Sequence, residues 1–230
     1  IDNKERMVDL KAGLRRVKDA FQAIPVKEED RPLIGIVGEI FCRLNTFANN
    51  DLIRHVEAQG GECWLSGVGE WVWYTNEEAF RRHREERRRI SKDWLKTFIT
   101  SRVMHADEKA LMEDFHDVFA HHPEPHVTQV LDYAHPYLPQ EGALGEMVLS
   151  TGGTIYLYHQ GVDGVIDISP FTCMNGIVTE AIYPRVSKDH DDIPIRVFYF
   201  DGTHSDLDRD VGIFLELAKT YKRRKKIRRA

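Results

Sequence analysis

The chain has 230 residues, of which 42% are hydrophobic and 30% are charged, and its formal net charge is −5. These values are typical of a globular chain with one sizeable core, and the negative charge argues against nucleic acid as a partner. Three widely spaced cysteines do not form a disulfide framework, which predicts a reducing, cytoplasmic compartment. No apolar run reaches membrane-spanning length, so no membrane partner is expected. The chain begins with Ile1, from which we expect a piece of a longer protein.

Residues 1–30 are expected to form a helix followed by a linker. Apolar side chains recur every three or four positions, which is the spacing of one helix face. They are Met7, Leu10, Leu14, Val17 and Phe21. Proline 25 and the acidic residues 28–30 then end the helix.

A strand–helix–strand pattern opens the main domain, which we expect to span residues 31–222. Residues 33–40, LIGIVGEI, predict a strand that is buried on both faces. A helix follows, capped by Asn49 or Asn50 and ended by Gly60 and Gly61, and residues 62–68 predict a second strand. This order implies a parallel pair joined by a right-handed crossover.

A helical insertion, at about residues 76–140, interrupts the alternation. Helical segments are expected at residues 80–96 and 106–119, and the sequence HHPEPH at 121–126 breaks the second of them. The three histidines of that segment favour a solvated loop over a metal site, because no carboxylate or cysteine is spaced to complete a cage.

The alternation then resumes. A helix is expected from about Gly142, strands at residues 162–171 and 193–202, helices at 175–186 and 207–221, and a basic tail at 223–230. Strands separated by helices predict an α/β fold, namely an open, doubly wound, mainly four-stranded parallel sheet that carries the insertion.

Ligands of such sheets bind outside the carboxyl ends of the strands. The candidate residues at this edge are Glu39, Cys42, Arg43, Asn45, Phe171 and Cys173. For Cys42 and Cys173, the residues alone leave two interpretations open, a packed or free thiol and a metal ligand. Cys63 lies within a strand pattern and is interpreted as buried and inert.

Several site types find no support in the sequence. There is no G-x-G-x-x-G fingerprint for NAD and no phosphate-binding loop for ATP. An iron–sulfur cluster normally takes four cysteine ligands. Two edge cysteines could therefore hold one only with further ligands from another domain or chain.

Four segments resemble a known family. They are GEIFCRLNTFANNDLIRHVEAQGGE, GALGEMVLSTG, GVDGVIDISPFTCMNGIVTEAIYPRV and IPIRVFYFDG. They resemble the 2-hydroxyglutaryl-CoA dehydratase D-component-like family, and most of all the carboxyl-terminal domain of large CoA-substrate-specific enzyme activases. The resemblance extends over about residues 31–222, and the strand followed by Pro-Phe-x-Cys is one of its specific parts.

This resemblance implies a flavodoxin-like fold and a role in anaerobic metabolism. Subunits of the family pair two such domains around an iron–sulfur cluster, which an ATP-hydrolysing activator reduces for the radical dehydration of a 2-hydroxyacyl-CoA. The position of Cys173 matches a cluster ligand, whereas Cys42 departs from the family pattern. The other ligands would come from a preceding domain, so the implied partners are other domains of a longer parent chain or a dehydratase or activator.

Three functional hypotheses follow. The first is a dehydratase- or activase-like domain in iron–sulfur-dependent electron transfer for CoA-ester dehydration. The second is a non-catalytic interaction module that has kept the fold but binds no cluster. The third and weakest is a small-molecule enzyme that grips an acid or amide with Glu39, Arg43, Asn45 and Asp201. The sequence supplies no complete catalytic set, so it leaves open whether the chain is an enzyme.

Overall fold

The computed structural model describes residues 3–27, 29–85, 91–120, 122–139, 144–203 and 206–225. The chain forms two compact units. The α/β unit comprises Asp30–Trp71 and Pro125–Ala230, and the helical unit comprises Ile1–Glu29 and Val72–Glu124. The insertion thus ends before the expected residue 140, and the amino-terminal helix is grouped with it. No helix in the described ranges has the length and apolarity needed to cross a membrane.

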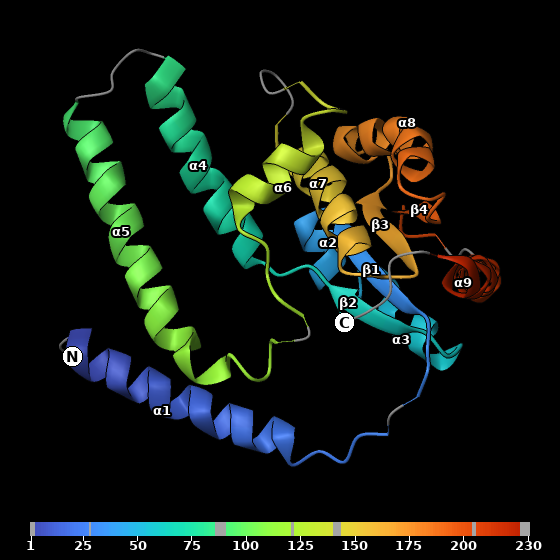
Figure 1. Ribbon diagram of the computed structural model, residues 1–230, viewed down its shortest axis with the longest axis horizontal. Helices are drawn as coiled ribbons and strands as arrows, with labels where there is room; N and C mark the ends of the chain where they lie inside the picture. Colours follow the sequence, from blue (N-terminus) through green and yellow to red (C-terminus); the bar gives the residue numbers. More distant parts are fainter. Residues whose placement is uncertain are drawn as a thin grey trace. The chain divides into compact units, whose positions relative to one another are not determined.

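The α/β unit is built on a four-stranded, all-parallel sheet, which confirms the predicted fold class (Figure 1). Its strands are β1 (Leu33–Gly38), β2 (Glu62–Leu65), β3 (Gly164–Pro170) and β4 (Ile195–Phe200). The strand order is β2-β1-β3-β4. The chain therefore moves outward from β1 to β2 and then returns past β1 to β3, which makes the β1–β3 boundary the topological switch point.

Helices cover both faces of this sheet because its central strands are apolar on both sides. Alternate residues of β1 and β3, such as Ile34, Ile36 and Ile166, pack with α3 (Leu52–Ala58) and α9 (Leu207–Arg224). The opposite set, which includes Leu33 and Val37, packs with α7 (Glu146–His159). Helix α8 (Met174–Asp189) contacts β3, β4 and α7.

A glycine within α7 allows α6 (Val127–Ala134) to pack closely against it. A Cβ atom at Gly152 would lie 1.9 Å from the carbonyl oxygen of Val130. Gly152 and Gly153 both lower the helix propensity of α7. Gly152 is nevertheless needed there, because it allows the close packing of α6. This close contact also places α6 in the α/β unit.

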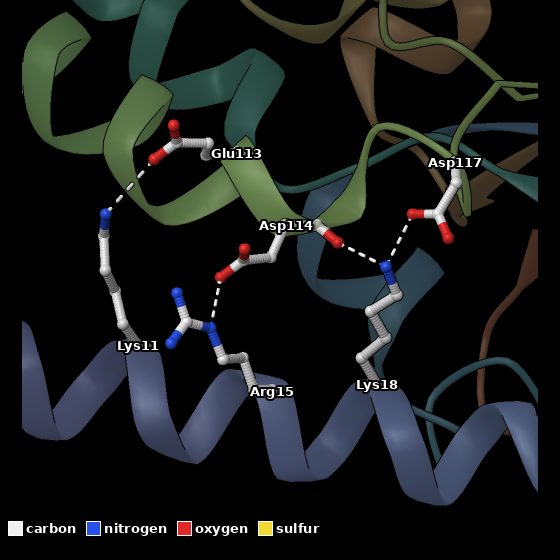
Figure 2. A network of polar contacts seen from close by, with 6 residues as sticks. All are labelled: Lys11, Arg15, Lys18, Glu113, Asp114 and Asp117. Carbon is white, nitrogen blue, oxygen red and sulfur yellow. Dashed lines mark hydrogen bonds and ion pairs between the residues drawn. The ribbon is translucent and has the colours of Figure 1, made fainter.

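The helical unit consists of α1 (Asn3–Gln22), most of α4 (Gly69–Glu85), α5 (Lys92–Met112) and the 3₁₀ turn η1 (Glu113–Phe115). Basic side chains of α1 form ion pairs with acidic residues at and after the end of α5 (Figure 2). These pairs are Lys11–Glu113 at 3.5 Å, Arg15–Asp114 at 2.6 Å and Lys18–Asp117 at 2.6 Å.

Several boundaries differ from those expected. Strand β1 ends at Gly38, because Glu39 caps an additional short helix, α2 (Ile40–Leu44). Asp51 directly precedes α3, and the Asn49 side chain accepts from the N–H of Leu52, the first residue of α3, at 3.4 Å and also donates to the carbonyl oxygens of residues 42 and 43. The helix expected at residues 80–96 is divided, since Ser91 caps α5. Gly142, His121 and the tail residues 226–230 lie outside the described residues.

The expected basic tail is in part a core element. Helix α9 continues to Arg224, and the next residue, Lys225, is buried. Its Nζ lies 2.6 Å from Oδ1 of buried Asp163 and donates to the carbonyl oxygen of Gly161. Oδ2 of Asp163 accepts from the backbone N–H of Leu33 at 2.8 Å. This network joins the end of the described chain to the starts of β1 and β3.

Replacing Lys225 with Met should therefore lower the free energy of unfolding by about 3–5 kcal/mol, because it leaves a buried carboxylate unpaired. Chemical denaturation monitored by circular dichroism measures the loss. The control is Arg223→Met on the exposed side of α9, which should change stability by less than about 0.5 kcal/mol. Equal effects of the two substitutions would contradict the assignment.

Candidate functional site

The candidate site lies at the carboxyl edge of the sheet, where β1 and β3 end side by side. Gly38 has φ +120°, and a Cβ atom there would lie 2.1 Å from the carbonyl oxygen of Ile168. Only glycine fits this turn. The next residue, Glu39, donates its N–H to the same oxygen at 2.8 Å. The segments that carry Cys42 and Cys173 therefore leave the sheet from neighbouring positions, at the switch point.

Two of the predicted cofactor-binding residues have local structural roles. The Glu39 carboxylate accepts hydrogen bonds from the backbone N–H groups of Phe41, at 3.1 Å, and Cys42, at 2.7 Å. It thereby caps α2. Asn45 lies at the other end of this helix, where its side-chain oxygen accepts from the N–H of Ala48 at 3.1 Å.

Cys42 lies in the core beneath the edge, with 3% of its surface exposed. Its Sγ is 3.8 Å from the carbonyl oxygen of Ala48. Burial, with smaller contributions from Glu39 and Cys173, raises the pKa of Cys42 to about 11. The thiol is therefore protonated at neutral pH, whereas a metal ligand must be a thiolate. The prediction that Cys42 is a ligand stays a prediction, and its burial weighs against it.

Cys173 occupies a different environment on the same edge. It is partly exposed and stands at the N-cap position of the 16-residue helix α8. The residue before it, Thr172, has φ +65°, which is rare for a β-branched residue. Backbone strain of this kind is concentrated at functional sites.

Exposed apolar side chains gather at this edge. They come from α2 and the loop after it, from the loop between β2 and α4, from the turn after β3, from the start of α8 and from the segment before α7, and each is at least 44% exposed. They are Phe41, Leu44, Phe47, Val68, Leu144, Phe171, Met174 and Ile177. We call this set the apolar rim. Phe171, predicted to lie beside a cofactor, is 62% exposed and contacts only the edge of the Tyr199 ring, at 6.5 Å between centroids, among the ring contacts of the described residues.

Arg43 was predicted to bind a ligand; its guanidinium makes one ion pair within the protein, whereas its buried Nε has no hydrogen-bond partner among the described residues. Arg43 is 3% exposed, and its Nη2 lies 2.7 Å from Oε1 of Glu70 at the start of α4. Burial raises the pKa of Glu70, and the Arg43 charge opposes that shift. Asp201, the other charged residue of the small-molecule hypothesis, is exposed after β4 and accepts hydrogen bonds from Thr203.

Sequence reasoning missed a buried carboxylate below the edge, Asp167 of β3. Its Oδ2 accepts from the hydroxyl of Tyr183 at 2.5 Å and lies 3.0 Å from that of Thr179. Burial raises the pKa of Asp167 to about 6, although these hydrogen bonds and the Arg43 charge oppose the shift. One signal was available in the sequence, because an acid within an apolar strand that is buried on both faces must lie in the core.

A second missed contact joins the starts of two helices. The Asn175 side chain, in the first turn of α8, donates to Oε2 of Glu146 at 2.7 Å, in the first turn of α7. Nothing in the sequence pairs these residues, since 29 positions separate them.

Two further findings concern metal ligands and similarity to known proteins. Within the described ranges, no group of three or more His, Cys, Asp or Glu side chains could hold a metal ion. No family model, no curated protein and no solved structure matches this chain.

Asp167 should make stability depend on pH. Because burial raises the pKa of Asp167 from its ordinary value of about 3.9 to about 6, the folded state binds the extra proton, and stability falls as pH rises from about 4 to about 6. In the Asp167→Asn variant, this decrease in the free energy of unfolding should be smaller by about 3 kcal/mol. Denaturation of both proteins from pH 4 to 7 measures the difference.

The matched control is Asp201→Asn. The pKa of exposed Asp201 is lowered by its hydrogen bonds from Thr203, so this carboxylate stabilises the fold above its unfolded pKa and loses that effect in acid. Its replacement should change the pH slope slightly, in the opposite direction. Parallel stability curves for wild type and Asp167→Asn would show that Asp167 does not titrate as argued.

The three thiols should differ in reactivity. Burial raises the pKa values of Cys42 and Cys63 to about 11 and about 12. Cys173 is partly exposed at the rim, so iodoacetamide should modify it at least about tenfold faster than either of the others. Peptide mass spectrometry gives the three rates, and the denatured chain, in which they should converge, is the control. Faster labelling of Cys42 in the native protein would contradict the assigned environments.

Proposed function

We propose that the apolar rim docks against another domain, and that Cys173 supplies one ligand to an iron–sulfur cluster whose other ligands come from that domain. The cluster would take part in the electron transfer that a dehydratase- or activase-like system uses to dehydrate a 2-hydroxyacyl-CoA. One observation carries the proposal. Cys63 and Cys173 are both partly exposed, but only Cys173 lies at the switch point of the sheet, where the adjacent residues Phe171 and Met174 are exposed apolar side chains.

The residues around Cys173 fit such a shared centre. A single thiolate cannot hold a cluster, which normally takes four protein ligands. The backbone of Cys173 is held between the strained Thr172 and the start of α8. The positive end of the helix dipole favours negative charge at that position. When the rim is covered, Phe171 and Met174 would exclude water, and exclusion of water tunes a cluster's reduction potential.

The buried residues of the edge would support the centre without binding it. The Arg43–Glu70 ion pair anchors α2 to the start of α4, and the Asn175–Glu146 hydrogen bond joins α8 to α7. Both contacts hold the segments beside Cys173 in place. The cluster, when bound, would supply one-electron transfer, whereas these side chains supply position and a low-dielectric boundary.

The second candidate is an interaction module without a cluster. The apolar rim favours it, because exposed apolar side chains at one edge of a sheet are typical of an interaction site whether or not a metal is present. The two candidates differ in one residue, since docking alone needs the rim but has no need of the Cys173 thiol.

The test is anaerobic iron and acid-labile sulfide analysis of the longest native chain that contains this domain. Cys173→Ser should lose most of the bound iron, whereas Cys63→Ser, within β2, should keep the wild-type content. Cys42→Ser tests the remaining cysteine, and its buried thiol predicts unchanged iron. A wild-type chain without iron, or Cys173→Ser with undiminished iron, would exclude the cluster and leave the interaction module.

A further inference from the structure

Helix α5 of the helical unit has an exposed apolar face opposite the face that is turned to α4. Its inner face is turned to α4, where His105 stacks on Trp73 with 3.9 Å between ring centroids, and Trp73 donates to Glu108 at 2.8 Å. Its outer face exposes Leu95, Ile99 and Val103, at 52%, 54% and 53%. An exposed apolar stripe on the side of a helix away from its own unit is typical of a surface that another element covers. We call Leu95, Ile99, Val103 and the neighbouring Ala106 the outer stripe.

We propose that a second copy of this chain covers the outer stripe, with its α5 packed antiparallel to the first. The contact is isologous, so each residue of the stripe meets stripe residues of the other copy. The proposal is independent of the function assigned to the edge of the sheet, because it concerns the other unit.

Charged side chains beside the stripe support this occupant. Lys96 and Asp107 are both exposed, and no ion pair of either is found within the described ranges. They are eleven residues apart, close to three helical turns, so they flank the stripe on the same side. A two-fold axis near residues 101 and 102 places Lys96 of each copy opposite Asp107 of the other. The positive charge lies near the start of the stripe and the negative charge near its end. Two copies therefore place opposite charges side by side only when their α5 helices run antiparallel.

The same axis also matches the apolar residues. It brings Val103 of the second copy within about one residue of Ile99, and Ala106 within about two residues of Leu95, so that large side chains meet smaller ones. Arg102 lies near the axis, where its long side chain can keep the guanidinium in water. Helix α1 leaves the stripe open, because its ion pairs are made with residues 113–117, beyond the end of the stripe.

One helix pair over three or four turns buries less than the standard interface of about 1,600 Å². The dimer should therefore be weak and dependent on concentration. Sedimentation equilibrium of the 230-residue chain should show a mass that rises from 26.7 kDa toward twice that value as concentration increases. A monomer at every concentration up to about millimolar would overturn the proposal.

The first variant places a charge in the stripe. Ile99→Glu should weaken dimerisation at least about tenfold, since it buries an unpaired carboxylate. The matched control is Ile213→Glu on α9, an isoleucine of similar exposure, 51%, in the α/β unit. It should leave the dimer unchanged, and circular dichroism verifies that both variants are folded. A dimer that survives Ile99→Glu, or that is lost equally with Ile213→Glu, would also overturn the proposal.

Charge reversal tests the antiparallel orientation. Lys96→Glu and Asp107→Lys should each weaken the dimer several-fold, because each places like charges opposite one another. The double variant should restore it, since the pairs reform with exchanged signs. Double-variant dimers as weak as those of the single variants would contradict the arrangement. None of these outcomes bears on iron binding at Cys173, so the two proposals fail separately.

Discussion

The pairing of β1 with β3, buried on both faces, is the constraint on which the α/β unit depends. Because both faces of these strands are apolar, helices must cover both, and the connections must return to the same edge of a parallel sheet. The β1–β3 boundary is also the point at which the strand order reverses. Sheet topology alone thus brings the segments of Cys42 and Cys173 together, although 130 residues separate them in the sequence.

Below that edge, buried polar side chains pair with one another, although Nε of Arg43 has no hydrogen-bond partner among the described residues. Arg43 pairs with Glu70, Tyr183 and Thr179 surround Asp167, and Glu39 caps α2. Burying a charge is costly unless it is paired, so these contacts are required for the edge to keep its shape. Once they are made, Cys173 and the apolar rim are what the edge presents to a partner. This division between supporting and exposed groups favours a docking surface over a small-molecule pocket.

The helical unit is held together differently. Its contacts with α1 include ion pairs near the surface, and such pairs contribute little to stability individually. Stable helical packing therefore depends on apolar faces, and α5 has one more of these than its own unit covers. The outer stripe of α5 and the charges of Lys96 and Asp107 beside it both favour self-association. The two units thus present separate apolar surfaces, one beside a thiol and one on a helix.

The sequence by itself determined the fold class and the edge on which the cysteines lie. The signals were local: apolar runs at β1 and β3, a helical period in α1 and glycines after the strands. Such a signal predicts an element correctly when the apolar residues of the pattern are also the ones that become buried. The uses of Arg43, Asp167 and Lys225 were decided only by the tertiary structure. Each depends on a partner distant in sequence, such as Glu70, Tyr183 or Asp163. Pattern predicts that a charged residue is present, but only the folded chain determines whether another side chain neutralises it or water surrounds it.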